Sequence, residues 1–298
     1  MTDKTPICEP PVFSVVIAVY NDWDALDECL RALSAQTGAP SFEVILVDDG
    51  STEPAPGTVG DISRGFPLAI IRQNHAGISV ARNRGIQASH GDVLLFIDAD
   101  CRVQPDCFAA LASKLATTPQ QSCFQLHLVG DCSNRVGRAE ELRLMTLQNY
   151  LLRSDGRIRY LNTAGFAIRR AKAPEDGNLF SPAATRAEDT LLLANLMKRG
   201  ELPVFVPEAT VRHAVRLSLM GCVRKDIRSA YVERKAFDLI AAQGLRIQLT
   251  NGDRLNILPA MWRSSGTDSI GRAAWFVVVG RQALRLVVST LYRAMHWS

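Results

Sequence analysis

Short apolar runs alternate with amphipathic stretches through the first hundred residues of the chain. Four runs rich in β-branched residues are typical of strands buried on both faces, and they span residues 13–22, 42–52, 66–73 and 92–101. Residues 22–38 and 78–91 instead place apolar side chains at helical spacing. This alternation predicts an α/β fold, in which helices flank both faces of a mostly parallel, Rossmann-like sheet.

The predicted strands end in polar residues. Those at the ends of the first, second and fourth strands are Tyr20, Asp22, Asp48, Asp49, Asp98 and Asp100. Parallel strands end at the same edge of a sheet, where the ligands of open α/β sheets bind. We therefore expect these side chains to line a binding cleft rather than the core.

The pattern changes in the second half of the chain. Residues 160–170 predict a strand with a turn of small residues inside it, and residues 187–200 predict a helix that opens with two acids. Residues 202–215 predict two short strands separated by Pro207. Basic amphipathic helices follow. The expected organisation is a tail at 1–12, an α/β domain at 13–215 and a helical extension at 216–298.

Composition narrows the classes of function. The 298 residues are 47% hydrophobic, as in a folded globular protein, and the formal net charge of +4 is too small to indicate nucleic-acid binding. The seven cysteines contain no C-x-x-C pair, which is typical of reduced thiols rather than of disulfides or a zinc site. The polar N-terminus lacks a signal-peptide core, so we expect a cytoplasmic chain.

The sequence LLFIDAD carries the clearest chemical signal, because an apolar strand runs directly into Asp98 and Asp100. Two carboxylates one residue apart can converge on a hard cation, Mg²⁺ or Mn²⁺, which takes diphosphate oxygens as further ligands. Such a cation would neutralise a departing nucleotide diphosphate. A solvated turn at the end of a strand is the alternative interpretation.

Five segments extend this signal, and in chain order they are SVVIAVYND, EVILVDDGST, GISVARNRGIQASHGDVLLFIDAD, TAGFAIRR and AED. Together, over residues 13 to 215, they resemble the family 2 glycosyltransferases, which have the GT-A fold. The resemblance implies an inverting, hexosyltransferase-type enzyme that moves a sugar from a nucleoside diphosphate, here most simply a UDP-sugar, to an acceptor hydroxyl. The implied acceptor is a glycan or a lipid-linked molecule of cell-envelope or secondary-metabolite synthesis.

The resemblance also implies roles for single residues on the donor side. Asp49 matches the carboxylate that accepts from the nucleobase, and Tyr20 matches an aromatic residue beside the base. Asp22 belongs to the same donor-binding rim. Arg82 would approach the diphosphate or the base, and Asp98 would face the ribose and the donor.

On the metal and acceptor side, Asp100 matches the residue that holds the cation, with Asp98 and His213 as further ligands. Asp189 matches the general base, and Glu188 beside it would shape the site. An inverting displacement needs a base on one face of the sugar and charge stabilisation of the leaving group on the other. Ordinary capping by first-turn acids is the alternative role for residues 188 and 189.

Three further positions qualify the resemblance. Gly165 is expected to let the backbone approach the donor or acceptor sugar, with a simple bulge as the alternative. Ala18 and Val19 stand where many relatives have Pro and Thr, which leaves the nucleotide open. His75 and His90 are interpreted as structural or surface residues.

Two other classes of function stay open. A degenerate member of the same fold could bind a nucleotide-sugar or glycan without turnover, although the presence of both Asp100 and Asp189 favours an enzyme. A nucleotidyltransferase would need a glycine-rich phosphate loop near the N-terminus, and the segment VVIAVYNDWD offers none.

The C-terminal extension predicts helices with a basic polar stripe, formed near the end by Arg281, Arg285, Ser289 and Arg293 at four-residue steps. No stretch is apolar enough to span a bilayer, so we expect a helix lying on the inner face of a membrane. Packing on the catalytic domain or on a second subunit, with arginine toward solvent, is the alternative. The oligomeric state is open.

Overall fold

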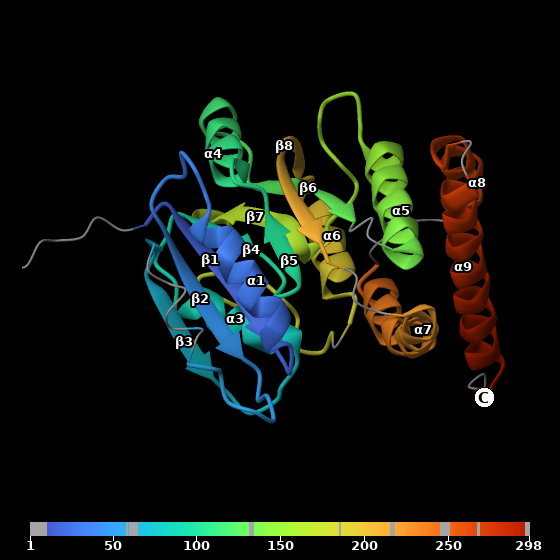
Figure 1. Ribbon diagram of the computed structural model, residues 1–298, viewed down its shortest axis with the longest axis horizontal. Coiled ribbons are helices and arrows are strands. Elements are labelled where there is room, and N and C mark those ends of the chain that lie inside the picture. The colour runs from blue at the N-terminus through green and yellow to red at the C-terminus, as the bar shows by residue number, and fades with distance from the viewer. Residues whose placement is uncertain are drawn as a thin grey trace, which may run out of the picture.

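The computed structural model describes residues 11–57, 59, 65–130, 134–184, 186–214, 218–244, 251–266 and 269–295, so most of the expected tail lies outside it. Within these residues, eight strands form one sheet in the order β3-β2-β1-β4-β7-β6-β8-β5 (Figure 1). The strands are β1 (Phe13–Val19), β2 (Phe42–Asp48), β3 (Leu68–Arg72), β4 (Val93–Phe96), β5 (Cys101–Val103), β6 (Cys123–Gly130), β7 (Phe166–Arg169) and β8 (Val204–His213).

Helices cover both faces of this sheet, which confirms the predicted α/β class. They are α1 (Trp23–Ser34), α3 (Ile78–Gln87), α4 (Cys107–Thr117), α5 (Arg135–Leu151), α6 (Glu188–Lys198), α7 (Leu219–Ala242), α8 (Asn251–Ser264) and α9 (Ser269–Met295). Successive residues of β1 pack on opposite faces. Val15 belongs to the same apolar cluster as Leu30 of α1, whereas Val16 clusters with Ile86 of α3.

Strands β3, β2, β1 and β4 run parallel, and the register pairs Val19 with Asp48. The polar ends of these strands therefore meet at one edge, as predicted. The expected strand over 92–101 is wrong in its second half, because β4 ends at Phe96. A turn follows, and Cys101 then starts β5, which pairs antiparallel with β8.

The two short strands predicted over 202–215 are a single strand, β8. Its pairing with β6 shifts register after Val206, because Leu126 pairs with Val206 while His127 pairs with Thr210. The extra residues form an irregularity that accommodates Pro207, which has no N–H to contribute to the ladder. One strand thus passes the proline and reaches His213 at the edge of the sheet.

The C-terminal helices pack beside α5, at the opposite end of the molecule from β3 (Figure 1). Arg281 and Arg285 of α9 lie 2.6 and 3.9 Å from Asp226 of α7, so these two arginines of the predicted stripe are ion-paired within the protein, although Arg285 stays partly exposed. The side chains of Ser289 and Arg293 lie outside the described residues. Among the described helices, none is long and apolar enough to cross a bilayer.

Candidate active site

The turn after β4 carries two of the predicted acids at the surface of the sheet edge. The Cys101 N–H donates to the Asp98 carbonyl (3.0 Å) and closes the turn. The Ala214 N–H donates to the Asp100 carbonyl (2.9 Å) and fastens the turn to the end of β8. The carboxylates of Asp98 and Asp100 remain 32% and 31% exposed, so both can meet a ligand.

Arg82 joins this turn to the N-terminus of α6. Its guanidinium is 2% exposed and donates to Asp98 (2.7 Å) and to Glu188 (2.6 Å), while it lies over the ring of Phe180. Burial opposes the charge of Arg82, but the two carboxylates raise its pKa. Both ends of the planar fork are therefore engaged within the protein, and Arg82 sets where the two acids lie.

Asp100 and His213 form a second pair, in which the imidazole Nε2 lies 3.3 Å from Asp100 Oδ2. Burial opposes the charge on each group, but their mutual hydrogen bond lowers the pKa of Asp100 and raises that of His213. The Cys101 thiol also lies nearby, with one donor atom from each of the three residues within 4.8 Å of the others. Burial and the acids hold the pKa of Cys101 far above its usual value, so the thiol is a poor ligand.

The Asp100–His213 pair fits the expected divalent cation. A carboxylate oxygen and an imidazole nitrogen are suitable ligands for Mn²⁺, and metal binding requires the imidazole to be neutral. His213 Nδ1 is buried and has no hydrogen-bond partner among the described residues. Asp98, the third expected ligand, accepts from Arg82 through Oδ1 (2.7 Å).

An exposed aromatic stack lies beside the end of β2. The rings of Tyr20 and His75 are 4.3 Å apart at an interplanar angle of 27°, and Tyr20 is 48% exposed. Asn21 adopts a left-handed conformation (φ +56°), which asparagine tolerates, and its side chain accepts from Thr52 N–H (2.8 Å). Asp22 is exposed just before α1. His75 is exposed, in line with the expected structural or surface role, but its stacking on Tyr20 was not predicted because the two residues are distant in sequence.

Asp49 is buried beneath the stack. Its carboxylate accepts from Gln73 Nε2 (2.7 Å), Ala76 N–H (2.9 Å) and Gly77 N–H (2.9 Å), and His75 Nδ1 lies 2.9 Å away. These contacts use the four acceptor sites of a carboxylate. Asp49 thus shapes the loop that carries His75, and a nucleobase would have to replace one of the four.

Helix α6 begins with the predicted base. Ala187 adopts a left-handed conformation (φ +56°), and Glu188 and Asp189 follow in the first helical turn. The Thr190 N–H donates to Asp189 Oδ1 (2.6 Å). The positive end of the helix favours the ionised form of Asp189.

Buried Tyr160 interacts electrostatically with Asp189, and it was not singled out from the sequence because the segment that it opens, residues 160–170, predicts only a strand. Burial raises the pKa of Tyr160 to about 12, and the Asp189 carboxylate contributes to the rise. The phenol therefore stays protonated. Asn162 Nδ2 donates to the phenol oxygen (3.2 Å) and fixes its position.

Gly165 closes a short 3-10 turn (Thr163–Gly165) before β7, so the strand expected over 160–170 is confined to Phe166–Arg169. A Cβ at Gly165 would lie 2.8 Å from Leu128 Cδ2 and 3.2 Å from Leu126 Cβ. Close packing on β6 therefore explains this glycine without a ligand.

A buried charge network lies behind this edge, between α5 and the C-terminal helices. Arg143 Nε donates to Glu140 (3.0 Å), and Arg281 lies 3.7 Å from the same carboxylate while donating to Asp226 (2.6 Å). Burial opposes the charge of Glu140, but Arg143, His213 and Arg281 lower its pKa far below the usual range. The C-terminal helices are thus electrostatically coupled to the Asp100–His213 pair.

Known proteins resemble this chain in sequence and in fold. A sequence model described as "Glycosyl transferase family 2" matches residues 14–177, more than half of the chain. The glycosyltransferase AglE of Haloferax volcanii is 40% identical over 98 residues, which cover 30% of this chain and 31% of AglE. The chain spans about a third or less of the length of such curated relatives.

Two solved structures share the fold. The mannosyltransferase PcManGT from Pyrobaculum calidifontis, in complex with GDP-Man and Mn²⁺, superimposes with a TM-score of 0.60 at 16% identity, covering 94% of this chain and 86% of that one. The 1–349 fragment of S. aureus TarS, in complex with UDP, gives 0.56 at 18% identity, covering 95% and 92%. The sheet is therefore of GT-A type, and the chain belongs to glycosyl transferase family 2.

Proposed function

We propose that the chain is a metal-dependent, inverting glycosyltransferase that moves a hexose from a nucleoside diphosphate to an acceptor hydroxyl. The observation that carries this proposal is the double ion pair of Arg82, which brings the turn after β4 together with the start of α6. This contact supports placing the proposed metal ligands, Asp100 and His213, and the proposed base, Asp189, at one edge of the sheet. Family membership supports the same reaction class.

The Tyr20–His75 stack offers a flat surface for the nucleobase, with Asp49 beneath it. UDP is the proposed nucleotide, since TarS has been solved with UDP and UDP-GlcNAc. PcManGT was solved with GDP-Man, so GDP-sugars have to be tested beside UDP-sugars as donors.

Asp100 and His213 would hold Mn²⁺ or Mg²⁺, and the bound cation would stabilise the negative charge of the departing diphosphate. Asp189, which the helix N-terminus keeps ionised, takes the proton of the acceptor hydroxyl. Glu188 positions Asp189 by anchoring the first turn of α6 to Arg82. A lipid-linked acceptor would place this reaction at the inner face of a membrane.

The proposal is tested by incubating the full chain with UDP-, GDP- and dTDP-sugars in the presence of Mn²⁺ and measuring release of the nucleoside diphosphate. We expect release from one donor class, including slow transfer to water, and its loss on chelation with EDTA. Calorimetry should show nucleotide binding that Mn²⁺ strengthens.

Matched variants separate the roles. Asp100→Asn should abolish the Mn²⁺ effect, while Asp27→Asn, on the exposed side of α1, should change nothing. The configuration of an isolated product, read by NMR at the anomeric proton, tests inversion. Binding of a nucleotide-sugar without release of diphosphate under every condition would instead identify a non-catalytic binding module.

A further inference from the structure

The outward face of α9 is apolar. Residues 276, 280, 283, 287 and 291 are exposed and recur at steps of three and four, so they share one side of the helix. The large apolar side chains exposed on α9 are Phe276, Leu286, Val287 and Leu291, each more than half exposed. A continuous apolar strip of this kind marks an interaction surface.

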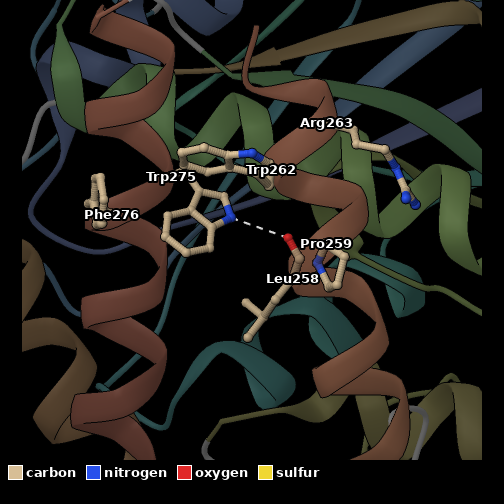
Figure 2. Close-up of a pocket in the computed structure, with 6 residues that line it drawn as sticks. All are labelled: Leu258, Pro259, Trp262, Arg263, Trp275 and Phe276. Carbon is tan, nitrogen blue, oxygen red and sulfur yellow. Dashed lines mark hydrogen bonds between the residues drawn. The ribbon is translucent and has the colours of Figure 1, made fainter. Parts of the chain in front are cut away.

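At one end of this strip, α8 and α9 line a shallow, open pocket of about 610 Å³. Its lining is Leu258, Pro259, Trp262, Arg263, Trp275 and Phe276 (Figure 2). Trp275 Nε1 donates to the Leu258 carbonyl (3.2 Å), which satisfies the polar atom of the indole and leaves its ring as apolar wall. Trp262, 41% exposed, packs edge-on against Trp275 with centroids 4.9 Å apart.

Positive charge surrounds the pocket. Arg263 lines it, and the Arg272 guanidinium lies 5.6 Å from the centroid of the Trp262 ring. The sequence of α9 contains no acid, and the single acid of α8, Asp253, accepts a hydrogen bond from Tyr150 of α5 (3.1 Å).

This charge pattern distinguishes between occupants. A symmetric dimer through this face would offer the arginines of each copy one acid of α8, Asp253, and no acid of α9. An anionic phospholipid leaflet matches both features of this surface, because its phosphates pair with the arginines and its acyl chains cover the apolar side chains. Tryptophan beside arginine on an apolar face is typical of the membrane interface.

We infer that the face formed by α8 and α9 docks on an anionic phospholipid leaflet, with Trp262, Trp275 and Phe276 inserted among the acyl chains and Arg263 and Arg272 at the phosphates. The geometry differs from the stripe expected from sequence, whose arginines at 281 and 285 turn inward. The biological role of this docking, delivery of the enzyme to a lipid-linked acceptor, rests on the proposed function. Binding to the leaflet can be measured whether or not the chain is active.

The test is flotation of the full chain with vesicles of phosphatidylcholine alone or with about 30% phosphatidylglycerol. We expect binding to the anionic vesicles, weakened by salt, with a blue shift of tryptophan fluorescence. Phe276→Ser and Arg272→Glu should each lower the partition coefficient about tenfold. The matched controls Ile70→Ser on β3 and Arg84→Glu on α3, both exposed elsewhere, should bind like the parent.

Leu286→Ser provides a second apolar variant should Phe276→Ser disturb folding, which circular dichroism will show. Absence of binding to anionic vesicles, or equal losses in the two controls, overturns the inference. The inference is also overturned if light scattering shows that the parent is a dimer and that Phe276→Ser dissociates it, because a second copy would then cover the face. Diphosphate release in lipid-free buffer is measured separately, so failure of docking and failure of the proposed activity give different results.

Discussion

Arg82 of α3 and Glu188 of α6 are 106 residues apart in the sequence, yet their side chains meet at 2.6 Å. The other end of the same guanidinium holds Asp98 at 2.7 Å. One buried arginine therefore determines the spacing between the turn that carries Asp98 and Asp100 and the helix that carries the proposed base. Its influence on catalysis passes through these two acids.

Replacing Arg82 by Met should lower the free energy of unfolding by about 3 kcal/mol, because two carboxylates lose their buried counter-charge. Urea denaturation followed by circular dichroism measures this change. Activity should fall mainly in kcat, since the base moves relative to the donor. Arg31→Met, which breaks an exposed pair with Asp27, should cost about 0.5 kcal/mol or less. Equal effects of the two substitutions would contradict the structural role of Arg82.

The edge of the sheet was predictable because parallel strands with continuous apolar runs leave one place for their polar ends. Val19 and Asp48 are paired in register, as that argument requires. The end of β4 was not predictable, since Ile97 and Ala99 alternate with acids as a strand would, although the backbone turns there. No elements were predicted between residues 104 and 159, where α4, β6 and α5 lie.

The orientation of α9 depends on residues that no local pattern reveals. Arg281 and Arg285 form a stripe whether they face lipid, water or a buried acid. Their partner Asp226 precedes Arg281 by 55 residues and belongs to another helix. Periodicity predicts that a helix has two faces, but only tertiary packing determines which of them is covered.

Asp189→Asn should reduce kcat for transfer by about 10²–10⁴-fold, because the amide cannot take the proton of the acceptor hydroxyl. Binding of the nucleotide, measured by calorimetry, should stay unchanged. Glu188→Gln keeps an oxygen for Arg82 and should lose far less activity. If Glu188→Gln were the more damaging substitution, the roles of the two neighbours would have to be exchanged.

Gly130→Ala should destabilise the end of β6 beside the metal-binding pair. The added Cβ would lie 2.6 Å from the backbone nitrogen of Glu141, and Gly130 pairs in register with His213. Overpacking of this kind costs about 1–3 kcal/mol, and the strand end carrying His213 should shift with it. We expect a lower melting temperature and a higher Mn²⁺ concentration for half-maximal activity. Gly57→Ala, with open space around the new methyl group, is the control.

Glu140 provides a prediction for the dependence of stability on pH. Its pKa in the folded chain lies far below the value of about 4.3 for an unfolded glutamate, so the unfolded state binds more protons as the pH falls. The stabilisation by Glu140 is complete above the unfolded pKa and is lost progressively as the pH falls toward the folded one.

Glu140→Gln should therefore lower the free energy of unfolding at pH 7 by about 3 kcal/mol and flatten its decline between about pH 5 and pH 3. Urea titrations across this range measure the slope. The exposed variant Asp27→Asn should keep the slope of the parent. An unchanged slope in Glu140→Gln would mean that the arginines at 143 and 281 do not hold this carboxylate ionised, and that other acids cause the loss of stability in acid.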